Sequence, residues 1–338
     1  MSSSICVGVI GDWDADGVVS SAEIVYSQEF LGIYPERGRA KTVLAPAGPR
    51  TLEEALGSLA ERGCRTVVVL DIPYTNNVLS ALRKFRDSFS RIIYVDHHLS
   101  SIVNSSKLES AVDELFLGKA PTAVLVSHII KSCGGRLTPR LEAFVNAAAF
   151  TERGGDRRSF ARYRRLVSIV IAVSRKLSRD RDRELWEKLV RWLASPLTMA
   201  AMPFSTEIAK MVEYRDLEKH LAELRYLAME LAPSAMRVAN VRIVDATKVK
   251  DVKLSALASQ LYRILKTPVI VVGVRGGRRI AVIRSRDDLP YKLALKLYEK
   301  GVAKDLGGHQ SIAVLVLRED VDTRRLADEV RKCLYELS

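Results

Sequence analysis

Three aspartates recur at alternate positions near the N-terminus, in the segment Gly-Asp-Trp-Asp-Ala-Asp-Gly at residues 11–17. Because like charges a few ångströms apart raise one another's pKa, Asp12, Asp14 and Asp16 can all ionise in one loop only where cations neutralise them. The spacing therefore indicates a metal site. A solvated acidic turn that caps the following helix is the alternative interpretation.

Two further segments offer metal ligands. Asp71 follows the apolar run 66–70, and Asp96, His97 and His98 follow the apolar run 91–95. Imidazole together with carboxylate suits manganese or another first-row divalent ion. Two such ions, bridged by a shared carboxylate at roughly 3.5 to 4 Å, would polarise a phosphoryl oxygen and generate hydroxide. Taken alone, Asp71 could equally be a turn residue.

The elements expected to position these side chains form an α/β pattern. The strands are predicted at Ile5 to Ile10, Lys41 to Ala45, Thr66 to Leu70 and Arg91 to Val95, and the helices at Val18 to Leu31, Leu52 to Arg62 and Asn77 to Phe85. Short β-branched runs that alternate with amphipathic stretches predict a parallel sheet with helices on both faces. In such a sheet functional groups gather beyond the carboxyl ends of the strands, where the acidic and imidazole residues occur.

A second α/β unit follows. Helical patterns occupy Ala123 to Lys131, Pro139 to Phe150 and Ser205 to Leu231, and strands return at Val238 to Val244, Pro268 to Val272, Ile280 to Ile283 and Ile312 to Leu317, with helices at Leu254 to Leu265, Pro290 to Lys300 and Thr323 to Leu337. We expect an N-terminal domain over residues 1–195, a helical connector over 196–235 and a smaller C-terminal α/β domain over 236–338.

Composition supports a soluble, basic protein. Of the 338 residues 48% are hydrophobic and 28% charged, and the net charge of +13 favours a polyanionic partner such as nucleic acid. The cysteines are widely separated, which predicts buried free thiols rather than a zinc knuckle or disulfide framework. The sequence shows neither a signal peptide nor a membrane span, so we expect a cytoplasmic protein that does not associate with membranes.

The motifs together resemble those of the DHH phosphoesterase superfamily. The segment 11–17 is similar to the first motif of the RecJ-like exonuclease branch, and Asp71 and Asp96-His97-His98 follow in the family's order. Near the C-terminus, Gly307-Gly308-His309 resembles the Gly-Gly-His motif of the DHHA1 domain, and Arg284-Ser285 its substrate-contacting pair. The resemblance implies a DHH domain, a helical connector and a DHHA1-like substrate-binding domain, with a metal-phosphate site between the two domains.

The resemblance also implies roles for these residues. The metal ligands would be Asp12, Asp14, Asp16, Asp71, His97 and Asp156, with Asp71 as the bridge and Glu152 competing with Asp156 for the fourth motif. The implied cofactors are two divalent ions, Mn2+ above all, with Mg2+ or Co2+ as alternatives. Asp96 and His98 would act near the attacking water, and His309 at the scissile or an adjacent phosphate. Substrate contacts would come from Arg284, Ser285, Gly307, Gly308 and His309.

The predicted function is hydrolysis of phosphodiester bonds in single-stranded DNA or RNA. An oligoribonuclease or cyclic-dinucleotide phosphodiesterase is the alternative within the same chemistry. A non-catalytic scaffold of a replication or repair complex is the alternative of another class, and replication or repair proteins are candidate partners. The arginine-rich segment 153–191 either follows a nucleic-acid backbone or forms an ion-paired surface, and the nearby Tyr163, Trp186 and Trp192 either stack bases or belong to the core.

Overall fold

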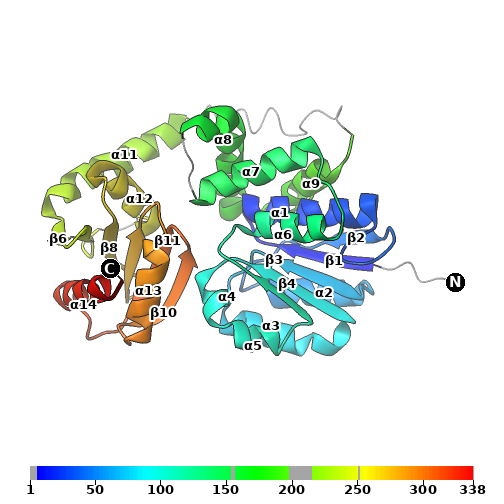
Figure 1. The fold of residues 1–338 in the computed structure, drawn as a ribbon, viewed down its shortest axis with the longest axis horizontal. Helices are drawn as coiled ribbons and strands as arrows, with labels where there is room; N and C mark the ends of the chain where they lie inside the picture. The colour runs from blue at the N-terminus through cyan, green and yellow to red at the C-terminus, as the bar shows by residue number, and fades with distance from the viewer. Residues whose placement is uncertain (1–5, 154–156, 198–214, 250–251, 338) are drawn as a thin grey trace. The chain divides into compact units, whose positions relative to one another are not determined.

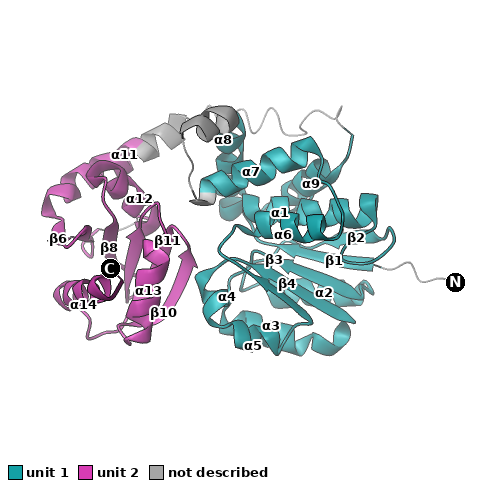
Figure 2. Ribbon diagram, viewed as in Figure 1, with its two compact units in different colours: residues 1–213 teal, residues 214–338 magenta. Residues whose placement is uncertain are grey.

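The computed structural model describes residues 6–153, 157–197, 215–249 and 252–337, without the side chains of 152–164 and 215–221. The chain divides into two compact units, residues 1–213 and 214–338, which are described separately (Figure 2). The predicted position of Asp156 lies outside the described residues, and so does the side chain of its competitor Glu152.

Unit 1 is built on a five-stranded, wholly parallel sheet with the order β2-β1-β3-β4-β5 (Figure 1). Its strands are β1 (Cys6–Gly11), β2 (Lys41–Leu44), β3 (Thr66–Leu70), β4 (Arg91–Asp96) and β5 (Glu114–Leu117). The Val-rich β3 is buried at every position, as expected for a central parallel strand covered on both faces.

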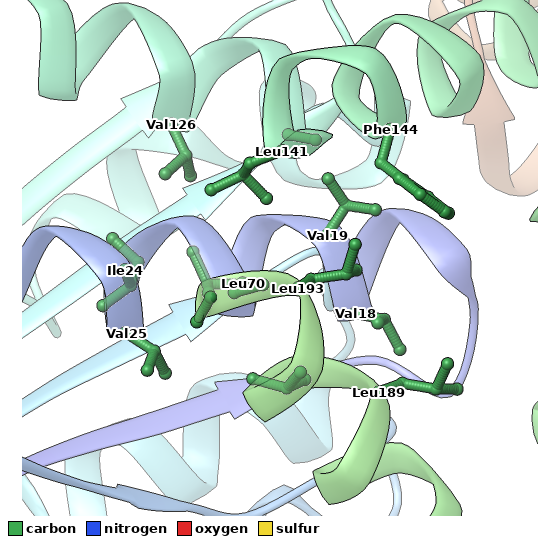
Figure 3. Packing of buried hydrophobic residues seen from close by; sticks show 14 of the residues in the cluster. Val18, Val19, Ile24, Val25, Leu70, Val126, Leu141, Phe144, Leu189 and Leu193 are labelled. Carbon is green, nitrogen blue, oxygen red and sulfur yellow. The ribbon is translucent and has the colours of Figure 1, made fainter. Parts of the chain in front are cut away.

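Helices cover both faces of this sheet. The helices of unit 1 are α1 (Ala15–Val25), η1 (Tyr26–Leu31), α2 (Leu52–Glu61), α3 (Asn76–Lys84), η2 (Arg86–Ser88), α4 (Leu99–Val103), α5 (Ser105–Glu109), α6 (Thr122–Ser132), α7 (Pro139–Arg153), α8 (Arg157–Asp180) and α9 (Arg183–Ala194). Of these, α7 and α8 pack mainly on other helices, α1 among them. Successive strand side chains point to opposite faces, so Val68 joins one core and Val69 the other. In the first core, side chains of α1 lie among those of α6, α7 and α9 (Figure 3).

The register of the sheet aligns the carboxyl ends of its three central strands. Gly11 at the end of β1 pairs with Leu70 at the end of β3, and Leu70 pairs with Val95 of β4. The residues that follow these strands therefore emerge at one edge of the sheet. This register brings the motif segments 12–16, 71 and 96–98 together.

The prediction that all four cysteines are free thiols is wrong for two of them. Cys6 and Cys64 form a disulfide across 58 residues, because β1 and β3 are parallel neighbours whose amino ends are level and the two Cα atoms lie 4.5 Å apart. Cys133 is free but exposed, and Cys333 is free and buried as expected.

Unit 2 contains a mixed six-stranded sheet with the order β10-β11-β9-β8-β7-β6. Its strands are β6 (Met236–Val238), β7 (Val241–Asp245), β8 (Val269–Arg275), β9 (Arg278–Arg284), β10 (Ala303–His309) and β11 (Ile312–Leu317), and its helices α11 (Arg215–Leu231), η3 (Ala232–Ser234), α12 (Leu254–Leu265), α13 (Leu289–Glu299) and α14 (Thr323–Leu337). β7 and β8 are parallel, and the other neighbours are antiparallel.

The predicted fold class is confirmed: a parallel, helix-flanked sheet precedes a smaller α/β unit. The division between residues 213 and 214 falls inside the expected connector, and the described part of that segment contains α11. In the described part of the chain, no helix has the length and apolar character needed to cross a membrane.

Candidate metal centre

Asp71 lies at the centre of the cluster and has an unusual backbone. It follows β3 directly, its φ is +62°, and its backbone N–H donates to the carbonyl of Val95 at 3.0 Å. Aspartate and asparagine adopt this left-handed conformation more readily than most residues. Asp71 is 1% exposed, and the turn places its carboxylate beside the end of β4.

The end of β4 supplies the two imidazoles. Nε2 of His97 lies 3.4 Å from Oδ1 of Asp71, and Nδ1 of His98 lies 2.7 Å from Oδ1 of Asp96. The hydroxyl of Ser101 donates to the other oxygen of Asp96. Because both oxygens of Asp96 are engaged, this carboxylate fixes the orientation of the His98 ring, whose Nδ1 also lies 3.9 Å from Oδ1 of Asp71.

The loop after β1 brings the three alternate aspartates to the same edge. Asp14 caps α1, because its Oδ1 accepts from the backbone N–H of Gly17 at 3.0 Å. Asp16 reaches toward α6, and its carboxylate accepts from the N–H groups of Thr122 at 2.7 Å and Ala123 at 3.0 Å. Gly17 is required here, since a Cβ at this position would lie 2.5 Å from the carbonyl oxygen of Asp12.

Burial and repulsion between neighbouring aspartates disfavour the charged carboxylates at this edge of the sheet. Burial and the charge of Asp14 raise the pKa of Asp12 to about 7. Burial, followed by the charges of Asp16 and Asp14, raises the pKa of Asp71 well above its ordinary value. Cations at this edge would reverse both effects, as expected of carboxylates that bind metal.

Asp96 and His98 behave as an ion pair. Although burial acts against the charge, the charge and hydrogen bond of His98 hold the pKa of Asp96 below its ordinary value. Burial also opposes the charge of His98, but Asp96 raises the pKa of His98 to about 9. The pair thus differs from Asp12 and Asp71, whose pKa values burial and nearby negative charges raise.

The donor set fits a divalent ion. Among the described residues, Asp71, His97 and His98 each offer one ligand atom, and these atoms all lie within 4.8 Å of one another. Nε2 of His97 is also 3.8 Å from Asp16. Carboxylates mixed with imidazole suit Mn2+, Mg2+ or another first-row ion better than a structural zinc, which favours thiolates.

Several residues that support this centre were not found from the sequence. Thr122 at the start of α6 donates its hydroxyl to Oδ1 of Asp71 at 2.9 Å, in addition to its N–H bond to Asp16. Ser174 of α8 accepts from the N–H of Ala15 at 2.9 Å, and Ser178 donates to the carbonyl of Trp13 at 3.1 Å. A small polar residue at a helix start was the only available signal for Thr122, and none existed for the two serines.

The arginine-rich segment is partly paired where its side chains are described. Arg179 pairs with Asp180, Arg183 with Glu187 and Arg191 with Glu29. Trp186 is fully buried and Trp192 packs edge-on against Phe144, so both tryptophans belong to the core. The side chain of Tyr163 lies outside the described part.

Unit 2 brings its own predicted substrate residues together. In the antiparallel ladder Ile312 lies opposite Arg284 on one side and His309 on the other. The guanidinium of Arg284 donates to the hydroxyl of Ser311 at 2.7 Å, and the N–H of Ser285 to the Ser311 carbonyl. Arg284, Ser285 and the Gly307-Gly308-His309 segment thus occupy one end of the sheet. That these residues face the metal centre stays a prediction.

Comparisons with known proteins identify similar folds. No family model matches the chain, and no curated protein matches its sequence. The fold is similar to that of RecJ from Thermus thermophilus in complex with Mn2+, at 15% identity and a TM-score of 0.56 over 98% of this chain and 52% of that one. The same RecJ with Mg2+ gives 15% identity and a TM-score of 0.50 over 98% of this chain and 50% of that one.

A DHH-domain member of the s1p family of ribosomal proteins is similar as well, at 14% identity and a TM-score of 0.60 over 98% of this chain and 86% of that one. The chain spans about half the length of the RecJ chains that it matches. The chain therefore has the same fold as these RecJ and DHH-domain structures.

Proposed function

We propose that the chain is a metal-dependent phosphodiesterase that hydrolyses single-stranded nucleic acid in the manner of a RecJ-like exonuclease. The observation that carries the proposal is the cluster of buried Asp71, buried His97 and partly exposed His98, whose ligand atoms lie within 4.8 Å of one another. The cluster lies at the carboxyl ends of parallel strands, where α/β enzymes place their chemistry. Asp71 of the cluster and the nearby Asp12 have raised pKa values, a further mark of functional sites.

Two divalent ions, with Mn2+ preferred, would be held by Asp12, Asp14, Asp16, Asp71, His97 and either Asp156 or Glu152. Such ions, when bound, polarise a phosphoryl oxygen and lower the pKa of bound water. Asp71 holds the central position, because the register of β3 and β4 and the turn at φ +62° direct its carboxylate toward His97. Asp96 holds His98 in a fixed orientation beside the cluster.

Unit 2 would hold the substrate. Arg284 and His309 supply cationic or hydrogen-bonding groups at one end of its sheet, and a guanidinium suits a phosphate oxygen. Gly307 leaves space beside its backbone, because no atom lies within 4 Å of a Cβ built there. A sugar-phosphate chain can therefore approach this backbone closely.

The net charge of +13 favours a long substrate over a dinucleotide, because the gain from counterion release grows with the number of phosphates engaged. The affinity for a long single strand should therefore fall steeply with salt. Salt-independent affinity would instead favour the short or cyclic dinucleotides of the alternative enzyme.

The proposal is tested with end-labelled DNA and RNA oligonucleotides of several lengths, and with cyclic dinucleotides, in Mn2+, Mg2+, Co2+ or EDTA. We expect cleavage with Mn2+ and none with EDTA. Asp71→Asn should abolish cleavage, and asparagine is chosen because it tolerates the left-handed backbone of Asp71. Asp87→Asn, which changes an exposed aspartate of the same unit, is the matched control.

Cleavage of no substrate, or equal cleavage by Asp71→Asn, would show that the chain is not this enzyme. The remaining candidate function would then be that of a non-catalytic scaffold in a replication or repair complex. Ladders from each labelled end give the direction of degradation.

A further inference from the structure

Strands β8 and β9 of unit 2 form a hairpin whose tip extends beyond the neighbouring strands. β7 ends at Asp245, opposite Val272 of β8, and β11 pairs with β9 only as far as Ile280. The tip is the turn Gly276-Gly277, in which both glycines have positive φ, +56° and +73°. Two-residue turns of this kind join antiparallel strands tightly. The last side chains of the two strands therefore project from the sheet on a short, tight hairpin.

The last pair of this hairpin places two arginines directly opposite each other. Arg275 pairs with Arg278, and both are exposed. Like charges that lie directly opposite in an antiparallel pair are unfavourable. Within the described part of the chain, neither guanidinium has a hydrogen bond or an ion pair. The fold thus keeps a repulsive pair without an internal counter-charge, which indicates a ligand of negative charge.

Two lysines lie near this arginine pair. Alternate residues of a strand share a face, so Arg275 is on the side of Gly273, where a Cβ would lie 2.6 Å from the side chain of Leu254. Leu254 begins α12, and the exposed Lys253 directly precedes it. Lys248, also exposed, lies in the loop after β7, the parallel neighbour of β8. Lys248, Lys253, Arg275 and Arg278 together are termed the hairpin patch.

The acids that follow β7 and β11 at this end of the sheet already have partners. These contacts are Asp245 with the hydroxyl of Thr323, Glu319 with Lys304, Asp320 with Arg325, and Asp322 with the backbone N–H of Arg325. Arg279, the next residue of the hairpin, faces the opposite side from Arg278 and donates to the carbonyl of Val321 at 2.8 Å. The hairpin patch therefore carries four positive charges that no described carboxylate balances with an ion pair.

The chemistry of the hairpin patch suits a chain of phosphates. A guanidinium can bind two oxygens of one phosphate through parallel hydrogen bonds, and a lysine attracts phosphate as a point charge. Four cations in one patch exceed the charge of a single phosphate group. A polymer with one negative charge in each repeating unit can engage several of them at once, and it gains affinity from the counterions that it releases.

We propose that the hairpin patch binds the phosphate backbone of single-stranded nucleic acid, apart from the predicted substrate residues at the other end of the same sheet. The choice of nucleic acid among polyanions rests on the proposed function. Arg278 and Arg284 stand at the two ends of β9, about 20 Å apart at the rise of an antiparallel strand. A dinucleotide held at Arg284 is too short to reach the patch, whereas a long strand can contact both ends. The patch therefore favours long substrates over short ones.

The proposal is tested by strand binding in EDTA, with a fluorescently labelled single strand followed by anisotropy at several salt concentrations. Arg275→Gln/Arg278→Gln should weaken binding about ten-fold. The slope of log affinity against log salt should fall by about 1.4, because each phosphate contact on a single strand contributes about 0.7. The affinity for an unlabelled dinucleotide, measured by competition, should not change. The Tm should not fall, because the substitution removes a repulsion between like charges.

Arg331→Gln/Lys332→Gln is the matched control. It also removes two exposed positive charges of unit 2, but these already pair with Asp328 and Glu329 on the same helix. Unchanged affinity and salt slope in the hairpin variant overturn the proposal. An equal loss in the control variant also overturns it, because net charge alone would then explain the effect. Displacement of the strand by polyglutamate as readily as by unlabelled strand overturns the assignment of a nucleic acid.

The proposed function and this site fail separately, because binding is measured in EDTA and cleavage with Mn2+. Metal-dependent cleavage with full strand affinity in the hairpin variant would keep the nuclease and remove the patch. Binding that depends on the patch, without metal-dependent cleavage, would leave a nucleic-acid-binding protein that is not a nuclease.

Discussion

Nε1 of Trp186 donates a hydrogen bond of 2.9 Å to the backbone carbonyl of Asp12, across 174 residues of sequence. Trp186 is fully buried in α9, and its ring lies so close to Gly11 that a Cβ there would be 3.0 Å from it. The indole, which belongs to α9, thus fixes the start of the loop that carries Asp12, Asp14 and Asp16. The conformation of the first motif depends on a helix that contributes no predicted ligand.

Trp186→Phe should therefore weaken metal binding as well as the fold. Phenylalanine fills much of the ring volume but removes the N–H, which leaves the Asp12 carbonyl without this donor. We expect the free energy of unfolding to fall by about 1 to 3 kcal/mol and the affinity for Mn2+ to fall about ten-fold, measured by denaturation and calorimetry. Trp192→Phe, in the same helix, is the control. Identical Mn2+ affinity in the two variants would refute the role of this hydrogen bond.

Thr122 should matter to the metal centre through its hydroxyl. Thr122→Val keeps the shape and the N–H bond to Asp16 but removes the hydrogen bond to Asp71. Because groups that orient metal ligands tune affinity, we expect Mn2+ to bind about 10- to 100-fold more weakly. Thr122→Ser, which retains the hydroxyl, should restore most of the affinity in the same titration. A valine variant that binds Mn2+ like the parent would contradict this role.

The sequence predicts the central strands of unit 1 well, because β3 and β4 are continuous β-branched or apolar runs that end in polar residues. It misses β5, which is a four-residue edge strand beginning with a glutamate, and β10, which contains two glycines. In both cases pairing with a neighbouring strand overrides weak local propensity.

Motif spacing likewise predicts the acidic and imidazole cluster, since the ends of parallel strands meet at one edge. It does not predict Trp186 or Thr122, because their contacts depend on how α9 and α6 pack onto the sheet. It also fails for Cys6 and Cys64, whose pairing follows from the order of β1 and β3 in the sheet.

Glu23 should make the protein less stable as the pH rises. Both of its carboxylate oxygens are buried without a described hydrogen-bond partner, and burial, followed by the charge of Asp16, raises the pKa of Glu23 well above its ordinary value of 4.5. As the pH rises above 4.5, the unfolded chain loses the Glu23 proton while the folded chain still keeps it, which favours unfolding. The stability that is present below pH 4.5 therefore declines until the pH passes the raised pKa of the folded protein.

Glu23→Gln removes that titration. We expect the stability gained by this variant over the parent to be about 1 to 3 kcal/mol larger at pH 8 than at pH 4. The free energy of unfolding of both proteins is measured by urea denaturation at both pH values. Glu54→Gln, at an exposed position of α2, is the control and should show no such pH dependence. A Glu23 variant with the same pH dependence as the parent would contradict the assignment.

Metal affinity should rise with pH through about 7, the pKa to which burial and the charge of Asp14 raise Asp12. Below this pH Asp12 carries a proton that a metal must displace, so affinity should fall about ten-fold per pH unit for each proton released. Calorimetry in two buffers of different ionisation enthalpy measures that release.

Asp12→Asn should bind Mn2+ more weakly and with less proton release near pH 7, whereas the exposed Asp87→Asn should match the parent. Affinity that stays level between pH 6 and pH 8 would show that Asp12 does not contribute to the metal site.

The adjacent glycines of unit 2 should respond differently to alanine. Gly308 has φ +96°, and a Cβ there would lie 2.3 Å from the carbonyl oxygen of Ile312 in the paired strand, whereas a Cβ at Gly307 meets no atom within 4 Å. We expect Gly308→Ala to lower the free energy of unfolding by at least about 2 kcal/mol and Gly307→Ala to change it by less than about 0.5 kcal/mol, both measured by denaturation.

Measurements of enzyme activity then distinguish Gly308, which the backbone requires, from Gly307, which leaves room for substrate. If a sugar-phosphate chain passes close to Gly307, Gly307→Ala should lower kcat/KM on single-stranded substrate while its stability and Mn2+ affinity match the parent. Unchanged kcat/KM in this variant would place the substrate elsewhere on unit 2. Full stability of Gly308→Ala would show that the backbone at this position relaxes, because the clash involves main-chain atoms of the paired strand.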